Sequence, residues 1–231
     1  CGLTDFDTLL IKVICNRPPV ANCPANVTKF LCQQQSVCIK GFSCTDPDNN
    51  LASSTVIGGT LSGDSVCFTP VAGKDSTYKI TLICTDSSGL ADTCMTLVTV
   101  KFNKPPVASC PNDVTKFLCQ QQSICIKGFS CTDPDNNLAS STVIGGTLSG
   151  DSVCFTPVAC KDSTYKITLI CTDSCGKADT CMTLVTVKND TTKPVITCKP
   201  DKTIDCAAAV VFDDPTATDS CDPTPTITIV S

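Results

Sequence analysis

The chain has 231 residues, with 21 cysteines, no histidine, no tryptophan and a formal net charge of −5 at pH 7. Lysine and arginine are scattered singly, so no basic stripe is present to neutralise phosphates, and we expect no nucleic-acid partner. No apolar run approaches the roughly 20 residues that a spanning helix needs, so we expect no membrane span.

The cysteine density is typical of a disulfide framework formed in an oxidising compartment. Structural zinc is the competing interpretation, but zinc sites favour close pairs such as C-x2-C, usually with histidine. The tightest spacing is Cys171 to Cys175, and histidine is absent. The composition therefore predicts disulfides and an extracellular or cell-surface location. Because the chain begins at Cys1 without a signal-peptide pattern, we expect any leader to have been removed or to lie outside this sequence.

An internal repeat organises the chain. Residues 18–104 align without gaps on residues 105–191, an offset of 87 positions at which 77 residues are identical. Residues 1–17 align at the same offset on the end of the first repeat, so they are predicted to be the final strand of a preceding or neighbouring-subunit domain. Residues 192–231 are predicted to be the N-terminal part of a third repeat.

The local signals within a repeat are all β. Short runs rich in Val, Ile and Thr are separated by Gly, Pro, Asn or Asp, and alternation places Ile80, Leu82 and Cys84 on one face of their strand. About seven strands at this spacing predict an all-β, disulfide-rich, elongated array of immunoglobulin-like sandwiches. The strands expected in repeat 1 are Val27–Cys32, Val37–Cys44, Ser65–Thr69, Tyr78–Cys84 and Cys94–Lys101.

Two resemblances follow from the motifs. The first two repeats, with PPVANCP, FSCTDPDNN and TYKITLICTDSSGLADTCMTLVTV, resemble the tandem immunoglobulin-like and cadherin-like domains of bacterial surface proteins. The third, with VITCKPDKTIDC and DPTATDSCDPTPT, resembles the hyalin repeat. Both resemblances imply extracellular sandwiches used in adhesion or scaffolding, and they specify the fold better than the role.

The sandwich topology sorts the cysteines by the end of the domain at which they lie. In repeat 1 it favours Cys23 with Cys94 and Cys44 with Cys84, and in repeat 2 it favours the copies of these pairs. Three cysteines of repeat 1 remain at the other end, so at least one of them is free or reaches outside its domain. The corresponding pairs of repeat 2 are Cys110 with Cys181 and Cys131 with Cys171.

Repeat 2 has two additional cysteines, Cys160 and Cys175. A strand of about nine residues separates them, roughly 30 Å at about 3.3 Å per residue, so they are too far apart to pair within one domain. We expect them to join neighbouring domains or chains.

The terminal segments carry complementary cysteines. If the N-terminal strand of one subunit completed the third repeat of the next, Cys1 with Cys221 and Cys15 with Cys206 would lock a head-to-tail polymer of identical copies. Against this, a stretch equivalent to 142–174 is supplied by neither fragment. The alternative is that the chain is a window on a longer tandem array.

Acidic residues gather on the loops predicted at one end of each sandwich. Calcium is one interpretation, since Ca²⁺ takes six to eight oxygen ligands, and ordinary turn chemistry of aspartate is the other. Asn26 and Asn189 lie in glycosylation sequons. The candidate calcium ligands are Asp46, Asp48, Asp86, Asp92, Asp133, Asp135, Asp173 and Asp179.

Nothing in the sequence indicates catalysis. Histidine is absent, no nucleophile elbow is present and the carboxylates lie in turn contexts, so we expect no enzyme and no cofactor apart from possible calcium. A carbohydrate-binding module is disfavoured because such sites use exposed aromatic platforms and the chain has only two tyrosines. The predicted function is a structural subunit of an extracellular filament or surface stalk. The alternative is a fragment of a tandem-repeat adhesin that binds calcium, glycans or other surface proteins.

Overall fold

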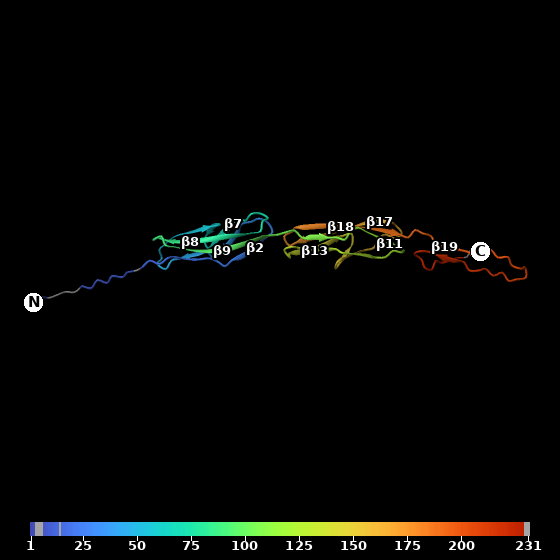
Figure 1. Cartoon of the computed structure of the whole chain (residues 1–231), viewed down its shortest axis with the longest axis horizontal. Helices are drawn as coiled ribbons and strands as arrows, with labels where there is room; N and C mark the ends of the chain where they lie inside the picture. The colour runs from blue at the N-terminus through green and yellow to red at the C-terminus, as the bar shows by residue number, and fades with distance from the viewer. Residues whose placement is uncertain (3–6, 14, 229–231) are drawn as a thin grey trace. The chain divides into compact units, whose positions relative to one another are not determined.

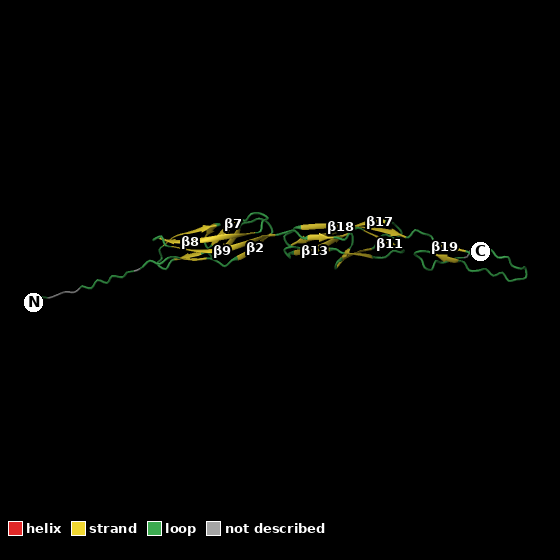
Figure 2. Ribbon diagram, in the orientation of Figure 1, coloured by secondary structure: helices red, strands yellow, loops and turns green. Residues whose placement is uncertain are grey.

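The computed structural model describes residues 1–2, 7–13 and 15–228. All regular structure in these residues is β, and they contain no helix (Figure 2). Consequently no helix of the described residues is long and apolar enough to cross a membrane. The chain divides into two compact units, Cys1–Asn103 and Lys104–Ser231, which are described separately below.

Repeat 1 is an immunoglobulin-like β-sandwich (Figure 1). One sheet has the strand order β2-β9-β8-β5, in which β2 runs parallel to β9 and the other neighbours are antiparallel. The opposing strands form an antiparallel sheet β3-β7-β6 and a short antiparallel pair β1-β4. The bounds are β1 Val20–Asn22, β2 Val27–Leu31, β3 Val37–Lys40, β4 Ser43–Thr45, β5 Leu51–Ile57, β6 Thr60–Ser62, β7 Ser65–Phe68, β8 Ser76–Asp86 and β9 Ala91–Phe102.

Repeat 2 has the same strand pairings. Its sheets are β11-β18-β17-β14, β12-β16-β15 and the pair β10-β13, with β11 parallel to β18. The bounds are β10 Val107–Ser109, β11 Val114–Leu118, β12 Ile124–Lys127, β13 Ser130–Thr132, β14 Leu138–Ile144, β15 Thr147–Ser149, β16 Ser152–Phe155, β17 Ser163–Asp173 and β18 Ala178–Asn189.

The core of repeat 1 lies between its sheets. Ile80, Leu82 and Cys84 of β8 are buried, which confirms the face predicted from their alternation. Val98 and Val100 of β9 are completely buried beside them. Repeat 2 has an equivalent core of its own, so each sandwich buries its apolar face without borrowing from the other.

The structure corrects two strand predictions. The run Val37–Cys44 is divided into β3 and β4, because Gly41 has φ +103° and redirects the chain from one short sheet to another. The strands β5 and β6 were not predicted, because they are rich in exposed Ser and Thr and lack apolar alternation. The chain crosses between them at Gly58 and Gly59, where a Cβ would lie 2.3 Å from the Lys79 carbonyl oxygen and 2.6 Å from Val66, respectively.

In residues 192–228 the third repeat has one antiparallel strand pair, β19 Val195–Thr197 and β20 Thr216–Thr218, joined by a long loop. Its register matches the β10-β13 pair of repeat 2, since the central residue Ile196 lies opposite Ala217 as Ala108 lies opposite Cys131. None of the residues 192–228 is buried. The described part of the third repeat therefore matches the first strand pair of a sandwich, and none of its residues is buried.

Candidate functional site at the junctions between repeats

Sixteen of the 21 cysteines are disulfide-bonded and five are exposed free thiols. Cys23 bonds to Cys94 and Cys44 to Cys84, the pairs expected from the sandwich topology, each with a Cα–Cα distance of 5.7 Å. A third bond joins Cys38 to Cys67, which face each other in the β3-β7 ladder. Cys32 is disulfide-bonded as well. Repeat 2 has the same three bonds, Cys110 to Cys181, Cys131 to Cys171 and Cys125 to Cys154.

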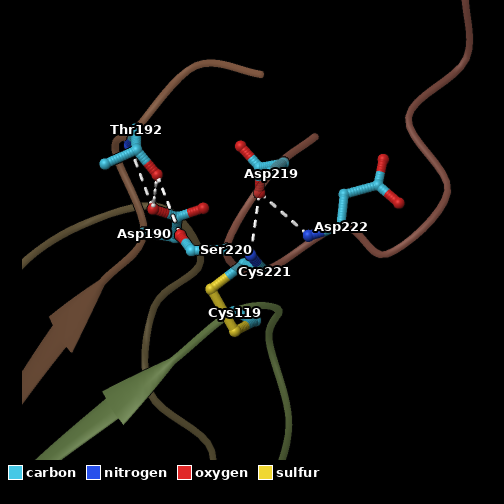
Figure 3. Close-up of a disulfide and its surroundings, with 7 residues drawn as sticks. All are labelled: Cys119, Asp190, Thr192, Asp219, Ser220, Cys221 and Asp222. Atoms are coloured by element: carbon cyan, nitrogen blue, oxygen red, sulfur yellow. Dashed lines mark hydrogen bonds between the residues drawn. A yellow bond between two sulfur atoms is a disulfide. The ribbon is translucent and has the colours of Figure 1, made fainter. Parts of the chain in front are cut away.

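One disulfide leaves repeat 2 and enters the third repeat. Cys119 bonds to Cys221 with a Cα–Cα distance of 5.0 Å, which is within the usual range for a disulfide (Figure 3). Cys119 directly follows β11, and the end of that strand is held where the backbone N–H of Asp190 donates to the Leu118 carbonyl at 3.0 Å. This backbone hydrogen bond therefore holds Cys119 in place at the end of β11.

The loop that carries Cys221 is shaped by local hydrogen bonds. Asp219 Oδ1 accepts from the backbone N–H groups of Cys221 at 2.8 Å and Asp222 at 2.9 Å, a turn that presents the Cys221 sulfur to Cys119 (Figure 3). On the linker before the third repeat, Thr192 donates both its backbone N–H and its hydroxyl to Asp190. These bonds lower the pKa of Asp190, the side-chain bond from Thr192 being the largest cause.

The acidic loops at the N-terminal end of repeat 1 are built in the same way. Asp46 Oδ1 accepts from the backbone N–H groups of Asp48 and Asn50, and Asp86 Oδ1 accepts from those of Ser88 and Leu90. Asp92 Oδ2 accepts from Ala21 of β1, and the copies Asp133, Asp173 and Asp179 do the same in repeat 2. These carboxylates organise turns and strand edges.

The remaining oxygens of these loops in repeat 1 bind the segment that precedes it. Arg17 donates its backbone N–H to Asp48 Oδ2 at 2.7 Å, and its guanidinium pairs with Asp48 Oδ1 at 2.8 Å. Asn16 donates its side-chain amide to Asp86 Oδ2 at 2.7 Å. At the corresponding place in repeat 2, Lys104 donates its backbone N–H to Asp135 Oδ2 at 2.6 Å. The acidic loops of each repeat therefore bind the residues that directly precede that repeat in the chain.

These contacts change the acidity of the two carboxyls. The side-chain hydrogen bond from Arg17 is the main cause that holds the pKa of Asp48 below its ordinary value of 3.8. The side-chain bond from Asn16, helped by backbone N–H groups, lowers the pKa of Asp86 in the same direction. Both groups are therefore charged near neutral pH and strengthen the bonds that they accept.

The geometry of the candidate calcium ligands shows their part in turns, and calcium binding by them stays a prediction. Among the described residues, no group of three or more Asp, Glu, Cys or His side chains comes together in a way that could hold a metal ion. The physical reason is that the carboxylate oxygens are used by backbone N–H groups and, in repeat 1, by the cationic Arg17. These hydrogen bonds show that the aspartates order the turns in which they lie.

The cysteines expected to join units behave in different ways. Cys221 was predicted to pair with Cys1, but Cys119 occupies it, because the turn at Asp219 directs Cys221 toward the end of β11. Cys160 is an exposed free thiol with φ +53°, and Cys175 is disulfide-bonded, so the two do not pair with each other. The other free thiols are Cys1, Cys15, Cys198 and Cys206.

The two glycosylation sequons differ in their surroundings. Asn26 is exposed, and its Oδ1 accepts from the Leu97 backbone N–H at 2.9 Å, as Asp113 does from Leu184 in repeat 2. At Asn189 the side-chain nitrogen is buried without a hydrogen-bond partner. A glycan attaches to that nitrogen, so the possible site at Asn189 is less accessible than the one at Asn26, and glycosylation at both stays a prediction.

The comparisons with known proteins identify no family to which the chain could be assigned. No family model matches the chain, and no curated protein matches it. Among solved structures, protocadherin gamma B7 cadherin domains 1–4 align with a TM-score of 0.49 and 13% identity, over 78% of this chain and 53% of that one. Drosophila N-cadherin EC1-4 aligns with a TM-score of 0.44 and 12% sequence identity, over 75% of this chain and 50% of that one. Immunoglobulin domains 1–4 of Sidekick-1 align with a TM-score of 0.38 and 10% sequence identity, over 75% of this chain and 50% of that one. The chain spans about half the length of these structures.

Proposed function

We propose that this chain is part of an extracellular structural protein, a surface stalk or filament in which successive sandwiches are joined by covalent bonds. The observation that carries the proposal is the Cys119–Cys221 disulfide, which joins one repeat to the next in addition to the peptide linker. A bond of this kind keeps neighbouring repeats attached when the linker is pulled or cut. Subunits of this kind would extend the array head to tail through further copies of the chain.

The location follows from the same chemistry. Sixteen disulfide-bonded cysteines require an oxidising compartment, because thiol systems keep such cysteines reduced in most cytosols. The two sandwiches have separate cores that are poor in aromatic residues, and each contains three internal disulfides that compensate for a small core. Resistance to unfolding and to proteolysis is the property that this construction favours.

The test is to cut the linker and ask whether the repeats stay together. A recognition sequence for a site-specific protease is inserted between Thr191 and Thr192, and the cut chain is run on a denaturing gel without and with reductant. The third repeat is expected to stay attached until reductant is added. In the matched variant Cys221→Ser it should leave without reductant. Release of the third repeat from the unsubstituted chain without reductant would contradict the proposal.

A second measurement addresses the compartment. Antibodies raised against the chain should label intact source cells without permeabilisation, and electron microscopy should place the label on extended surface structures. Labelling that requires permeabilisation would contradict the extracellular assignment.

A further inference from the structure

Cys32 and Cys175 are both disulfide-bonded, and they belong to different repeats. Repeat 1 has seven cysteines, and the six others pair among themselves in three bonds, so the partner of Cys32 lies outside repeat 1. In repeat 2 the other cysteines form three internal bonds, bond to Cys221 or, at Cys160, remain a free thiol. The partner of Cys175 therefore lies outside repeat 2 as well.

Cys32 lies next to the point where the chain leaves repeat 1. It directly follows β2, which runs parallel to β9, the last strand of the repeat. Directly after β9, the backbone N–H of Asn103 donates to the Leu31 carbonyl at 2.9 Å. This hydrogen bond holds the departing chain at the residue that precedes Cys32.

Cys175 lies next to the point where the chain enters repeat 2. It is in the turn between β17 and β18, where its backbone N–H donates to Asp173 Oδ1 at 2.9 Å and its sulfur accepts from the Asn137 side-chain amide at 3.8 Å. Asn137 belongs to the loop between β13 and β14, in which Asp135 Oδ2 accepts from the Lys104 backbone N–H at 2.6 Å. The incoming chain and the Cys175 sulfur therefore contact the same loop.

The peptide chain connects these two points directly. Asn103 and Lys104 are consecutive residues, and Cα atoms are about 3.8 Å apart across a trans peptide bond. We propose that Cys32 and Cys175 of the same chain form a disulfide that joins repeat 1 to repeat 2. The inference rests on the covalently joined array of the proposed function and extends it to the junction between these two repeats.

The junction after repeat 2 is the precedent for this bond. Cys119 is the copy of Cys32 at the offset of 87 residues, and the N–H of Asp190 holds the end of β11 at 3.0 Å as that of Asn103 holds the end of β2. From this place Cys119 bonds forward to Cys221 in the following repeat. The cysteine that follows β2 has the same surroundings in its own repeat, so we expect it to bond forward in the same way.

The receiving sulfur comes from a different residue at each junction. Cys221 lies in the loop after β20, where its backbone N–H donates to Asp219 Oδ1 at 2.8 Å. In repeat 2 the same turn is made by Asp133, whose Oδ1 accepts from the N–H of Asp135 at 2.8 Å, so an aspartate stands where the third repeat has its cysteine. The neighbouring turn between β17 and β18 supplies Cys175 instead.

Formation of the bond needs an oxidant. The two thiols lose two protons and two electrons as the S–S bond forms, and a disulfide oxidant RSSR accepts them and leaves as two RSH molecules. The junction is then crossed twice, once by the peptide bond between Asn103 and Lys104 and once by the disulfide. A cut in the linker would leave repeats 1 and 2 attached.

The first test cuts this linker in matched variants of the full chain. A recognition sequence for a site-specific protease is inserted between Asn103 and Lys104, and the cut chain is run on a denaturing gel without reductant. Repeat 1 should stay attached, and the double variant Cys32→Ser with Cys175→Ser should release it. Cys160→Ser is the control, because Cys160 is an exposed free thiol of repeat 2, and it should keep the repeats attached.

A second measurement uses the unaltered sequence. A mixture of ¹⁴N- and ¹⁵N-labelled chains is refolded together in a buffer of reduced and oxidised glutathione, and its thiols are blocked before non-reducing digestion and peptide mapping. Cys32 and Cys175 should be recovered as a linked peptide pair in which both peptides carry the same isotope.

Three results would overturn the inference. They are recovery of Cys32 or Cys175 as a blocked thiol, a bond between differently labelled chains, and release of repeat 1 from the cut parent chain without reductant. Any of these with an intact Cys119–Cys221 bond would leave the proposed function standing on the junction between repeat 2 and the third repeat. Loss of the Cys119–Cys221 bond would instead count against the proposed function.

Discussion

Removal of the Cys44–Cys84 bond should destabilise repeat 1 strongly. The bond closes a loop with a sequence separation of 40 residues, and the chain-entropy relation gives about 4 kcal/mol for a loop of this length. Cys84 is completely buried, so the double substitution Cys44→Ala with Cys84→Ala avoids leaving an unpaired polar group in the core. Small domains are stable by about 5–15 kcal/mol, so this loss is a large fraction of the total.

The measurement is denaturant unfolding of the full chain, with one spectroscopic probe in each repeat to monitor its transition. The transition of repeat 1 should move to lower denaturant, and that of repeat 2 should stay in place. The same substitutions at Cys131 and Cys171 should reverse the pattern, because the second bond has the same sequence separation of 40 residues. Cys160→Ser, at an exposed free thiol, should change stability by no more than about 0.5 kcal/mol. A change below about 1 kcal/mol on removal of the buried bond would refute the reasoning.

Four further outcomes are expected. Asp48→Asn should reduce hydrogen-exchange protection of the Arg17 backbone N–H, whereas the control Asp64→Asn should not; protection unaffected by either change would contradict the docking of the linker. In the parent chain the exchange protection of the Arg17 N–H should be fully present above pH 3.8. It should be lost as the pH falls below 3.8, through the lowered pKa of Asp48. Loss of protection at a higher pH would show that another group controls the contact. Chelation with EDTA should leave the Tm unchanged, and a fall of several degrees would revive the calcium interpretation. Gly59→Ala should cost about 1–3 kcal/mol in denaturant unfolding, because its Cβ would lie 2.6 Å from Val66; a neutral result would show that the β5-β6 crossing relaxes easily.

The sequence predicted the sandwich well where alternation and repetition were strong. The burial of Ile80 and Leu82 followed from their period, and the duplicated cysteines could be sorted by the end of the sandwich on which their strands finish. It failed at β5, where Ser and Thr on an exposed strand carry no periodic signal, because that strand is held by its ladder with β8. The break at Gly41 was missed because a single glycine with φ +103° interrupts an otherwise continuous apolar run.

The junction was harder to predict than the fold. An aspartate that orders a turn and one that binds calcium have the same sequence signature, and only the donors around Asp46 and Asp86 distinguish them. The contact of Arg17 with its acidic loop had a signal in the sequence, because a cation directly before a proline recurs as Lys104 before Pro105. The partner of Cys221 was mispredicted because the bond depends on the turn at Asp219, which no spacing rule encodes.

The most direct test of a covalently joined array is non-reduced peptide mapping of the native protein with its thiols blocked before digestion. The account predicts a peptide pair that links Cys119 to Cys221. Recovery of Cys119 as a blocked thiol, or of Cys221 linked to Cys1, would contradict it.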